Sequence, residues 1–277
     1  MAFQAFSTKA RPVHLGPYPL ERLKRGPMPD LGAVPPFTPM TFRNPDAPAS
    51  LVNAMDEYQA MMDAIRDGLV ARVRSEIPSD RTERANHLKA FGYFSDSAMV
   101  GIGPVPDAAR LANPVRNPGI DRLAGELRTR QTKTLASGID LIMADLRDAM
   151  EAPPSGIDGH THALVFVNER PRDPLPGEPG TAWLAGASDA AAALRATETA
   201  VVLANYIRLL GWDAKAHTPT SSDVDLNRMA VAAGLAVPEG DGITVPYAGH
   251  GVGIAVVTTT LDMTTDAPLA PLAEQPP

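Results

Sequence analysis

The chain has 277 residues and a mass of 29.3 kDa; 44% of its residues are hydrophobic and 21% are charged. A chain of this length buries roughly three quarters of its unfolded surface and needs no cross-link to fold. The formal net charge is -7 and no basic run occurs, which argues against nucleic acid as a partner. There is no cysteine, so this chain cannot hold an iron–sulfur cluster or use a thiol in chemistry.

Apolar runs are short along the whole sequence. The first 12 residues include basic side chains but no apolar stretch of signal-peptide length. The longest apolar stretch, residues 200–204, is far too short to cross a bilayer. We therefore expect a soluble protein with no membrane partner and a cytoplasmic location.

Prolines are concentrated near the N-terminus, at Pro12, Pro17, Pro35, Pro36, Pro39, Pro45 and Pro48. Each lacks an N–H group and restricts the residue before it, so we expect residues 1–50 to form an extended arm on the surface. Prolines return in residues 267–277, which are expected to be a linker or a tail. Residues 51–266 are expected to form one folded module.

Two long helices are predicted in the first half of this module. Apolar residues recur every three or four positions, which predicts one buried helical face ending before Pro78: Leu51, Met55, Tyr58, Met62, Ile65, Leu69 and Val73. Residues 88–101 are expected to form a short strand or a turn-rich connection. Asn117 is a predicted cap, with Pro118 in the first turn, of a second helix that continues to Met150.

Strands alternate with helices in the second half. Residues 163–167 (ALVFV) are a buried-type strand, and Ser188 is a predicted cap for a long helix that ends at Gly211. A strand near residues 213–216, a helix near 223–233 ended by Gly234, and strands at 243–246 and 252–260 follow. This alternation predicts an α+β or α/β domain of two or three layers.

His217 and the serines after it form the most informative local pattern, in AHTPTSSDVDLNR. His217 ends a predicted strand, and Ser221 and Ser222 precede a predicted helix whose first N–H groups are free. Such junctions commonly receive anionic or polar ligands. Ser222 with Asp225 also fits the S-x-x-D capping pattern, so helix capping alone and capping with ligand contact both stay open.

Glycines are frequent just before the last strand, at Gly240, Gly242, Gly249, Gly251 and Gly253. They allow either tight turns or the close approach of the backbone to something bulky. No G-x-G-x-x-G pattern stands between a strand and a helix, which excludes a dinucleotide fingerprint. Tyr247 lies among them and is either a proton donor in a pocket or an ordinary, partly buried side chain.

Two histidines, His160 and His162, precede the strand ALVFV and would face the same side of an extended chain. Imidazole is a common metal ligand, but no third ligand stands at a diagnostic spacing. We expect polar residues at a strand entrance and no metal site. No hydrolase elbow, zinc-protease helix or phosphate-loop lysine occurs either, so no catalytic residue is predicted.

Three segments together resemble the cobalamin-dependent reductive dehalogenases and their epoxyqueuosine reductase relatives. They are KAFGYFSDSAMVGIGPVPDAARL at 89–111, ATETAVVLANYIRLLGWDAKAH at 196–217, and LNRMAVAAGLAVPEGDGITVPYAGHGVGIAVVTTTLDM at 226–263. The first carries a Val-Gly pair and the second a helix followed by a strand. The third resembles a segment of the family in which the same residue types occur in the same order: Ala230, Val231, Ala232, Ala233, Gly234, Leu235, Gly242, Ile243, Thr258, Thr259 and Leu261.

The resemblance implies a nitroreductase-like α+β fold. HLGPYPLERL at 14–23 is similar to the start of the soluble, catabolic members of the family. In those, an N-terminal module like a degenerate cobalamin domain precedes a working cobalamin domain and a ferredoxin-like domain with two clusters. The chain is thus expected to be that module, a non-catalytic scaffold. Its expected partner is a cobalamin-binding and ferredoxin-like domain, downstream or on another chain, and the complete enzyme would remove halide from aryl halides.

The sequence departs from the family at the glycine turn and at the cluster cysteines. Residues 234–242 contain Pro238 and acidic groups where the family has a basic one, and no Tyr with a matching Lys or Arg aligns as a proton-donating pair. Two other functions stay open: a stand-alone cobalamin-binding protein and a flavin-dependent oxidoreductase of similar fold. The predicted cofactor-binding residues are His217, Ser221, Ser222, Gly234, Gly242 and Tyr247.

Overall fold

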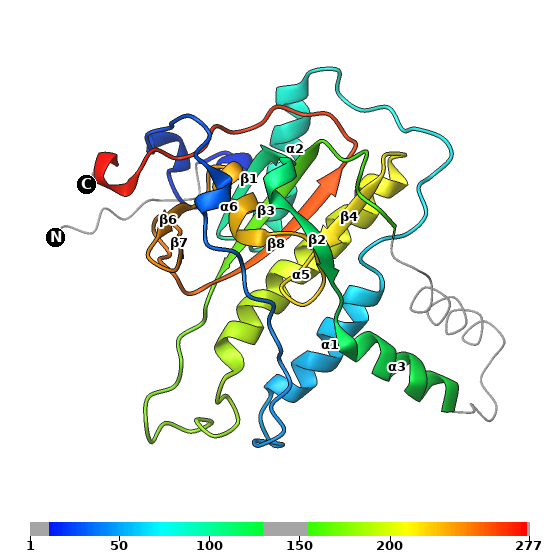
Figure 1. Ribbon diagram of the computed structural model, residues 1–277, viewed down its shortest axis with the longest axis vertical. Coiled ribbons are helices and arrows are strands. Elements are labelled where there is room, and N and C mark those ends of the chain that lie inside the picture. Colours follow the sequence, from blue (N-terminus) through cyan, green and yellow to red (C-terminus); the bar gives the residue numbers. More distant parts are fainter. Residues whose placement is uncertain (1–10, 130–154, 276–277) are drawn as a thin grey trace.

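The computed structural model describes residues 11–129 and 155–275 (Figure 1). Its centre is a four-stranded antiparallel sheet in the order β1-β3-β8-β4. The strands are β1 (Met99–Pro104), β3 (His162–Glu169), β8 (Val252–Thr259) and β4 (Ala214–His217). Two small antiparallel pairs lie beside it: β2 (Arg110–Val115) with β5 (Ser222–Val224), and β6 (Val237–Glu239) with β7 (Gly242–Thr244).

Helices cover both faces of the central sheet. Alternate residues of β3 point to opposite sides: Leu164 and Phe166 join the core on the side of α5 (Ala187–Leu209), whereas Val165 and Val167 join the core on the side of α6 (Leu226–Ala232). The other helices are α1 (Val52–Ala64), α2 (Arg81–Phe94) and α3 (Pro118–Thr129). The prediction of a mixed α+β fold is confirmed.

The strand and the helix ends in the second half were predicted well. The strand predicted at 163–167 is the buried centre of β3. Gly211 and Gly234 follow α5 and α6 with φ of 96° and 66°, the left-handed conformation in which glycine ends helices. In the first half, Asn117 Oδ1 accepts a hydrogen bond from Gly119 N at 2.8 Å at the start of α3. Residues 130–150 of that predicted helix lie outside the described residues.

The predicted helix over residues 51–73 is wrong in its length and in its buried face. Helix α1 ends at Ala64, and Leu69 is 97% exposed. The face turned inward carries Gln59, Ala60 and Asp63, because the interior beside α1 is polar. A rule that places apolar residues inward therefore selects the wrong side of this helix.

Three further expectations are corrected. Residues 88–94 belong to α2, which was missed because only three of its residues are buried and only one of these has a large apolar side chain: Ala85, Leu88 and Gly92. Ser188 does not cap α5; Gly186 precedes that helix, and the Ser188 hydroxyl donates to Asp173. Ser222 does not cap α6 either, because it lies in β5 and the cap is Asp225, whose carboxylate accepts from Arg228 N at 3.0 Å.

The proline-rich segment, residues 11–50, holds three short 3-10 turns. Its side chains Leu20 and Leu31 belong to the same core as α6, and Arg25 bridges to Leu269 near the other end of the chain. The domain boundaries at residues 50 and 267 stay predictions. No helix within the described ranges has the length and apolar character needed to cross a bilayer.

Candidate functional site

His217 lies at the end of β4 in a buried polar cluster and is 0% exposed. Its Nδ1 accepts a hydrogen bond from Asp223 N at 3.1 Å, so the ring proton is on Nε2, which lies 2.8 Å from Thr258 Oγ1. The Thr258 hydroxyl then donates to His160 Nδ1 at 2.7 Å. His160 Nε2 faces Asp213 at 3.2 Å. Hydrogen bonds thus join His217, Thr258 and His160 in one row, whose outer end faces the half-exposed Asp213.

Asp223 is the anionic centre of the same cluster. Its carboxylate lies 2.8 Å from Lys215 Nζ, 3.0 Å from Arg66 Nη1 and 3.4 Å from His217 Nδ1. Burial raises the pKa of Asp223, but the Arg66 guanidinium and the other two groups lower it more, so the net pKa is below its ordinary value. Burial also lowers the pKa of Lys215.

Asp63 forms the second part of the cluster, on the inner face of α1. It accepts hydrogen bonds from Thr218 Oγ1 at 2.6 Å, from Asn117 Nδ2 at 2.8 Å and from Thr220. Burial raises its pKa, and these donors oppose that rise. Ser221 Oγ accepts from Asn117 N at 2.9 Å. These hydroxyl and amide donors therefore provide the hydrogen bonds that solvent would otherwise give to this buried carboxylate.

The structure brings three of the predicted site residues together: His217, Ser221 and Ser222 are each 0% exposed. Their hydrogen bonds go to other protein groups of the cluster, and Ser222 Oγ donates to Val224 O at 2.6 Å. A ligand the size of a corrin ring would have to open the core to touch them. Their closed bonding is what a structural polar core requires.

The other three predicted site residues lie elsewhere. A Cβ on Gly234 would stand 2.2 Å from Ala267 O, so that space is filled by the chain itself. Gly242 is in the β6–β7 hairpin, with nothing within 4 Å of an added Cβ. Tyr247 stacks on Tyr18, with ring centroids 5.2 Å apart. The six residues do not fit a cobalamin ligand as one cradle, and cobalamin binding by them stays a prediction.

The neutral state of the buried histidines makes stability depend on pH. Burial lowers the pKa of His217 well below 6.5, with Arg66, Lys215 and His160 adding to this and Asp223 opposing it. In the unfolded chain the His217 imidazole binds a proton near pH 6.5, whereas in the folded chain it stays neutral at that pH. The free energy of unfolding is therefore highest above pH 6.5 and falls as the pH drops below it. We expect the free energy of unfolding to fall by at least about 1 kcal/mol between pH 7.5 and pH 5.5.

Urea unfolding across this pH range measures the effect. The raised pKa of Asp63 works in the opposite direction, so the informative quantity is the difference between wild type and His217→Gln, which should lose most of the slope. The exposed His87, with a side chain 67% exposed, provides the control: His87→Gln should keep the wild-type slope. An unchanged slope in His217→Gln would contradict the assignment.

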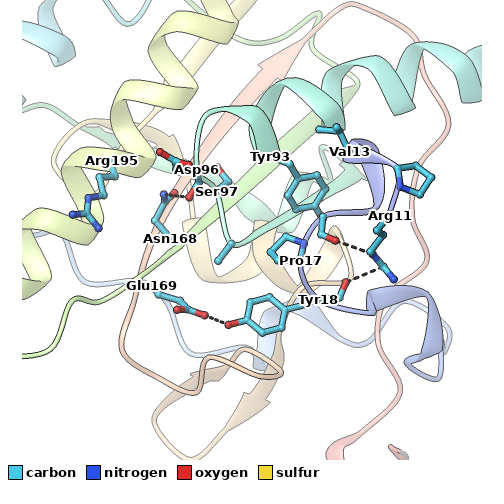
Figure 2. A pocket seen from close by; sticks show the side chains of 13 residues that line it. Arg11, Val13, Pro17, Tyr18, Tyr93, Asp96, Ser97, Asn168, Glu169 and Arg195 are labelled. Atoms are coloured by element: carbon cyan, nitrogen blue, oxygen red, sulfur yellow. Dashed lines mark hydrogen bonds between the residues drawn. The ribbon is translucent and has the colours of Figure 1, made fainter. Parts of the chain in front are cut away.

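A pocket that the sequence did not predict lies between residues 11–18, the turn after α2 and the end of β3 (Figure 2). Its volume is about 550 Å³. Tyr18, Tyr93, Asp96, Ser97, Asn168 and Arg195 are among its lining residues. No motif joins these positions, which come from four separate segments. The sequence could not identify this pocket, because no sequence pattern sets Ser97 or Asn168 apart from other polar residues.

The comparisons with known proteins point to one family. No protein-family model matches the chain, and no curated protein matches it. The solved structure titled "Reductive dehalogenase structure suggests a mechanism for B12-dependent dehalogenation" is 30% identical, with a TM-score of 0.72 over 98% of this chain. The catabolic reductive dehalogenase NpRdhA matches with 31% identity and a TM-score of 0.71, also over 98%. Its complex with 3-bromo-4-hydroxybenzoic acid matches over 96% of this chain.

This chain spans about a third of the length of these neighbours, because the matches cover 32% of each neighbouring chain. A structure of epoxyqueuosine reductase aligns less well, at 12% identity and a TM-score of 0.37 over 68% of this chain. Over nearly its whole described length, the chain therefore has the fold of one part of a reductive dehalogenase.

Proposed function

We propose that this chain is the N-terminal module of a cobalamin-dependent reductive dehalogenase, with a nitroreductase-like fold and no catalysis of its own. The observation that supports this is the match of 98% of this chain to 32% of the neighbours, at 30–31% identity. The partner is a cobalamin-binding and ferredoxin-like domain, downstream or on another chain. The complete enzyme removes halide from aryl halides, and cobalamin supplies that chemistry when bound to the partner.

An exposed apolar row supports a scaffold role. Val202, Tyr206 and Leu209 stand at i, i+4 and i+7 on α5 and are 48%, 45% and 63% exposed. Phe94, at the end of α2, is 84% exposed, and the Phe91 ring stacks near Tyr206 at 6.4 Å. Contiguous apolar surface of this kind usually marks an interface. These residues are what this chain contributes: a face for the partner to bury.

The closed polar cluster supports the non-catalytic part of the proposal. Its central groups, His217 and Lys215, are 0% exposed and bonded to neighbouring protein atoms, so no substrate reaches them. The proposed location is the cytoplasm, since a chain without cysteine needs no oxidising compartment to fold.

Hydroxocobalamin binding tests the proposal directly. The purified chain is mixed with hydroxocobalamin and desalted, and its visible spectrum is recorded. We expect the corrin bands to leave with the small molecules, because His217, Ser221 and Ser222 are enclosed. Corrin bands that stay with the protein would favour a stand-alone cobalamin-binding protein, and a yellow, flavin-bound preparation would favour a flavin-dependent oxidoreductase.

The reading frame that adjoins this sequence tests the modular part. We expect a segment with two C-x-x-C-x-x-C-x-x-x-C-P runs, which hold the clusters of ferredoxin-type domains. Such runs must lie outside this chain, because it has no cysteine. Finding neither run in the adjoining frame nor in a neighbouring one would contradict the proposal.

A further inference from the structure

Two buried polar atoms in the pocket of Figure 2 have no hydrogen-bond partner among the described residues: Ser97 Oγ and Asn168 Oδ1. Ser97 is 3% exposed and Asn168 is 2% exposed. The Asn168 amide donates from Nδ2 to Asp96 O at 3.2 Å, which leaves Oδ1 as an acceptor. Buried polar atoms without partners are costly and rare in native proteins, so these two indicate something that binds there.

Backbone strain is concentrated at the same place. Within the described ranges, Asp96 and Tyr247 are the non-glycine residues with positive φ, at 62° and 68°. Asp96 lines the pocket, and Tyr247 stacks on Tyr18, which also lines it. Asp tolerates this conformation, whereas a bulky aromatic residue does not adopt it without compensation. Strain of this kind is found at ligand sites more often than elsewhere.

The pocket also carries one carboxylate and one guanidinium that form neither an ion pair nor a side-chain hydrogen bond with the described residues. Tyr18 donates to the Glu169 carboxylate, and Arg11 pairs with Glu21 at 2.7 Å. Asp96 and Arg195, by contrast, form no ion pair with any residue that the structure describes. They come from different elements, the turn after α2 and helix α5 (Figure 2). A ligand with two opposite charges would satisfy both.

We propose that this pocket binds an amino acid with an apolar side chain. The ammonium group donates to Asn168 Oδ1 and Ser97 Oγ and is balanced by the Asp96 carboxylate. The carboxylate of the ligand pairs with Arg195. The side chain packs against the rings of Tyr18 and Tyr93, in a space of about 550 Å³. This inference is independent of the proposed role in dehalogenation.

Three probes that share one aromatic group test the charges. They are L-phenylalanine, 2-phenylethylamine, which lacks the carboxylate, and 3-phenylpropionate, which lacks the ammonium. Isothermal titration calorimetry at constant ionic strength should show L-phenylalanine binding at least about tenfold more tightly than either analogue. Equal affinities for all three, or no heat with L-phenylalanine, would overturn the proposal and leave ordered water as the partner of Ser97 and Asn168.

Variants assign the contacts. Ser97→Ala removes a buried hydroxyl that has no protein partner, so we expect a melting temperature no lower than that of wild type and about tenfold weaker L-phenylalanine binding. Arg195→Gln should weaken L-phenylalanine to the level of 2-phenylethylamine and leave 2-phenylethylamine unchanged. The exposed Ser79 provides the matched control, since Ser79→Ala should bind as wild type. Wild-type affinity in both Ser97→Ala and Arg195→Gln would contradict the assigned site.

Discussion

Replacing Asp223 with alanine is expected to lower the free energy of unfolding by about 3–5 kcal/mol. The carboxylate lies 2.8 Å from Lys215 Nζ and 3.0 Å from Arg66 Nη1, and those two side chains are 0% and 7% exposed. Its removal leaves the buried Arg66 guanidinium without an ion-pair partner among the described residues, and leaves Lys215 with the more distant Asp67 carboxylate, 3.8 Å from Nζ. Lys215 can lose its proton, because burial already lowers its pKa, but the Arg66 guanidinium stays charged. Urea unfolding followed by circular dichroism measures the change.

An exposed aspartate gives the control for this result. Asp241 stands in the β6–β7 hairpin and is exposed, so Asp241→Ala should change the free energy of unfolding by no more than about 0.5 kcal/mol. The double variant Asp223→Ala/Arg66→Met should recover part of the loss, because an apolar side chain replaces one unpaired charge. A loss below about 1 kcal/mol in Asp223→Ala would mean that the cluster is open to water.

The fold was predictable from sequence wherever a buried face is made of apolar side chains. The strand β3 contains a run of five apolar residues, and each of its faces packs against a hydrophobic core. The ends of α5 and α6 were predictable because Gly211 and Gly234 adopt a conformation that other residues avoid. Helix α1 was predicted on its wrong side, because Asp63 and Gln59 face inward and each finds partners only in the folded chain.

The candidate site was only partly predictable, for a related reason. The sequence predicted a strand–helix junction at His217, Ser221 and Ser222, and the structure buries all three side chains. The prediction that Ser222 caps a helix is wrong, because Ser222 lies in β5. Lys215 gave no signal, since a lysine in a short strand is usually exposed, and here Asp223 makes its burial tolerable. Ser97 lies in the turn after α2 and Asn168 in β3, so the pocket exists only in the tertiary structure.

The glycines near the C-terminus were expected to allow either tight turns or the close approach of the backbone to something bulky. At Gly253, in β8, the close neighbour is the backbone of helix α5. A Cβ added to Gly253 would stand 2.2 Å from Ala192 C, 2.3 Å from Ala192 O and 2.5 Å from Ala193 N. All three atoms belong to the backbone of α5, a helix of 23 residues that covers the sheet. A flexible side chain could move aside; the backbone of a packed helix moves only with its whole contact surface.

Gly253→Ala is therefore expected to lower the free energy of unfolding by about 3 kcal/mol or more, beyond the usual cost of an added methyl group in a core. Gly242→Ala is the matched control, because nothing lies within 4 Å of its added Cβ, and it should stay within about 0.5 kcal/mol of wild type. Urea unfolding of both variants measures the difference. Equal stability of the two variants would show that β8 and α5 do not pack this closely. The close packing would then no longer explain how α5 holds its exposed apolar row in place.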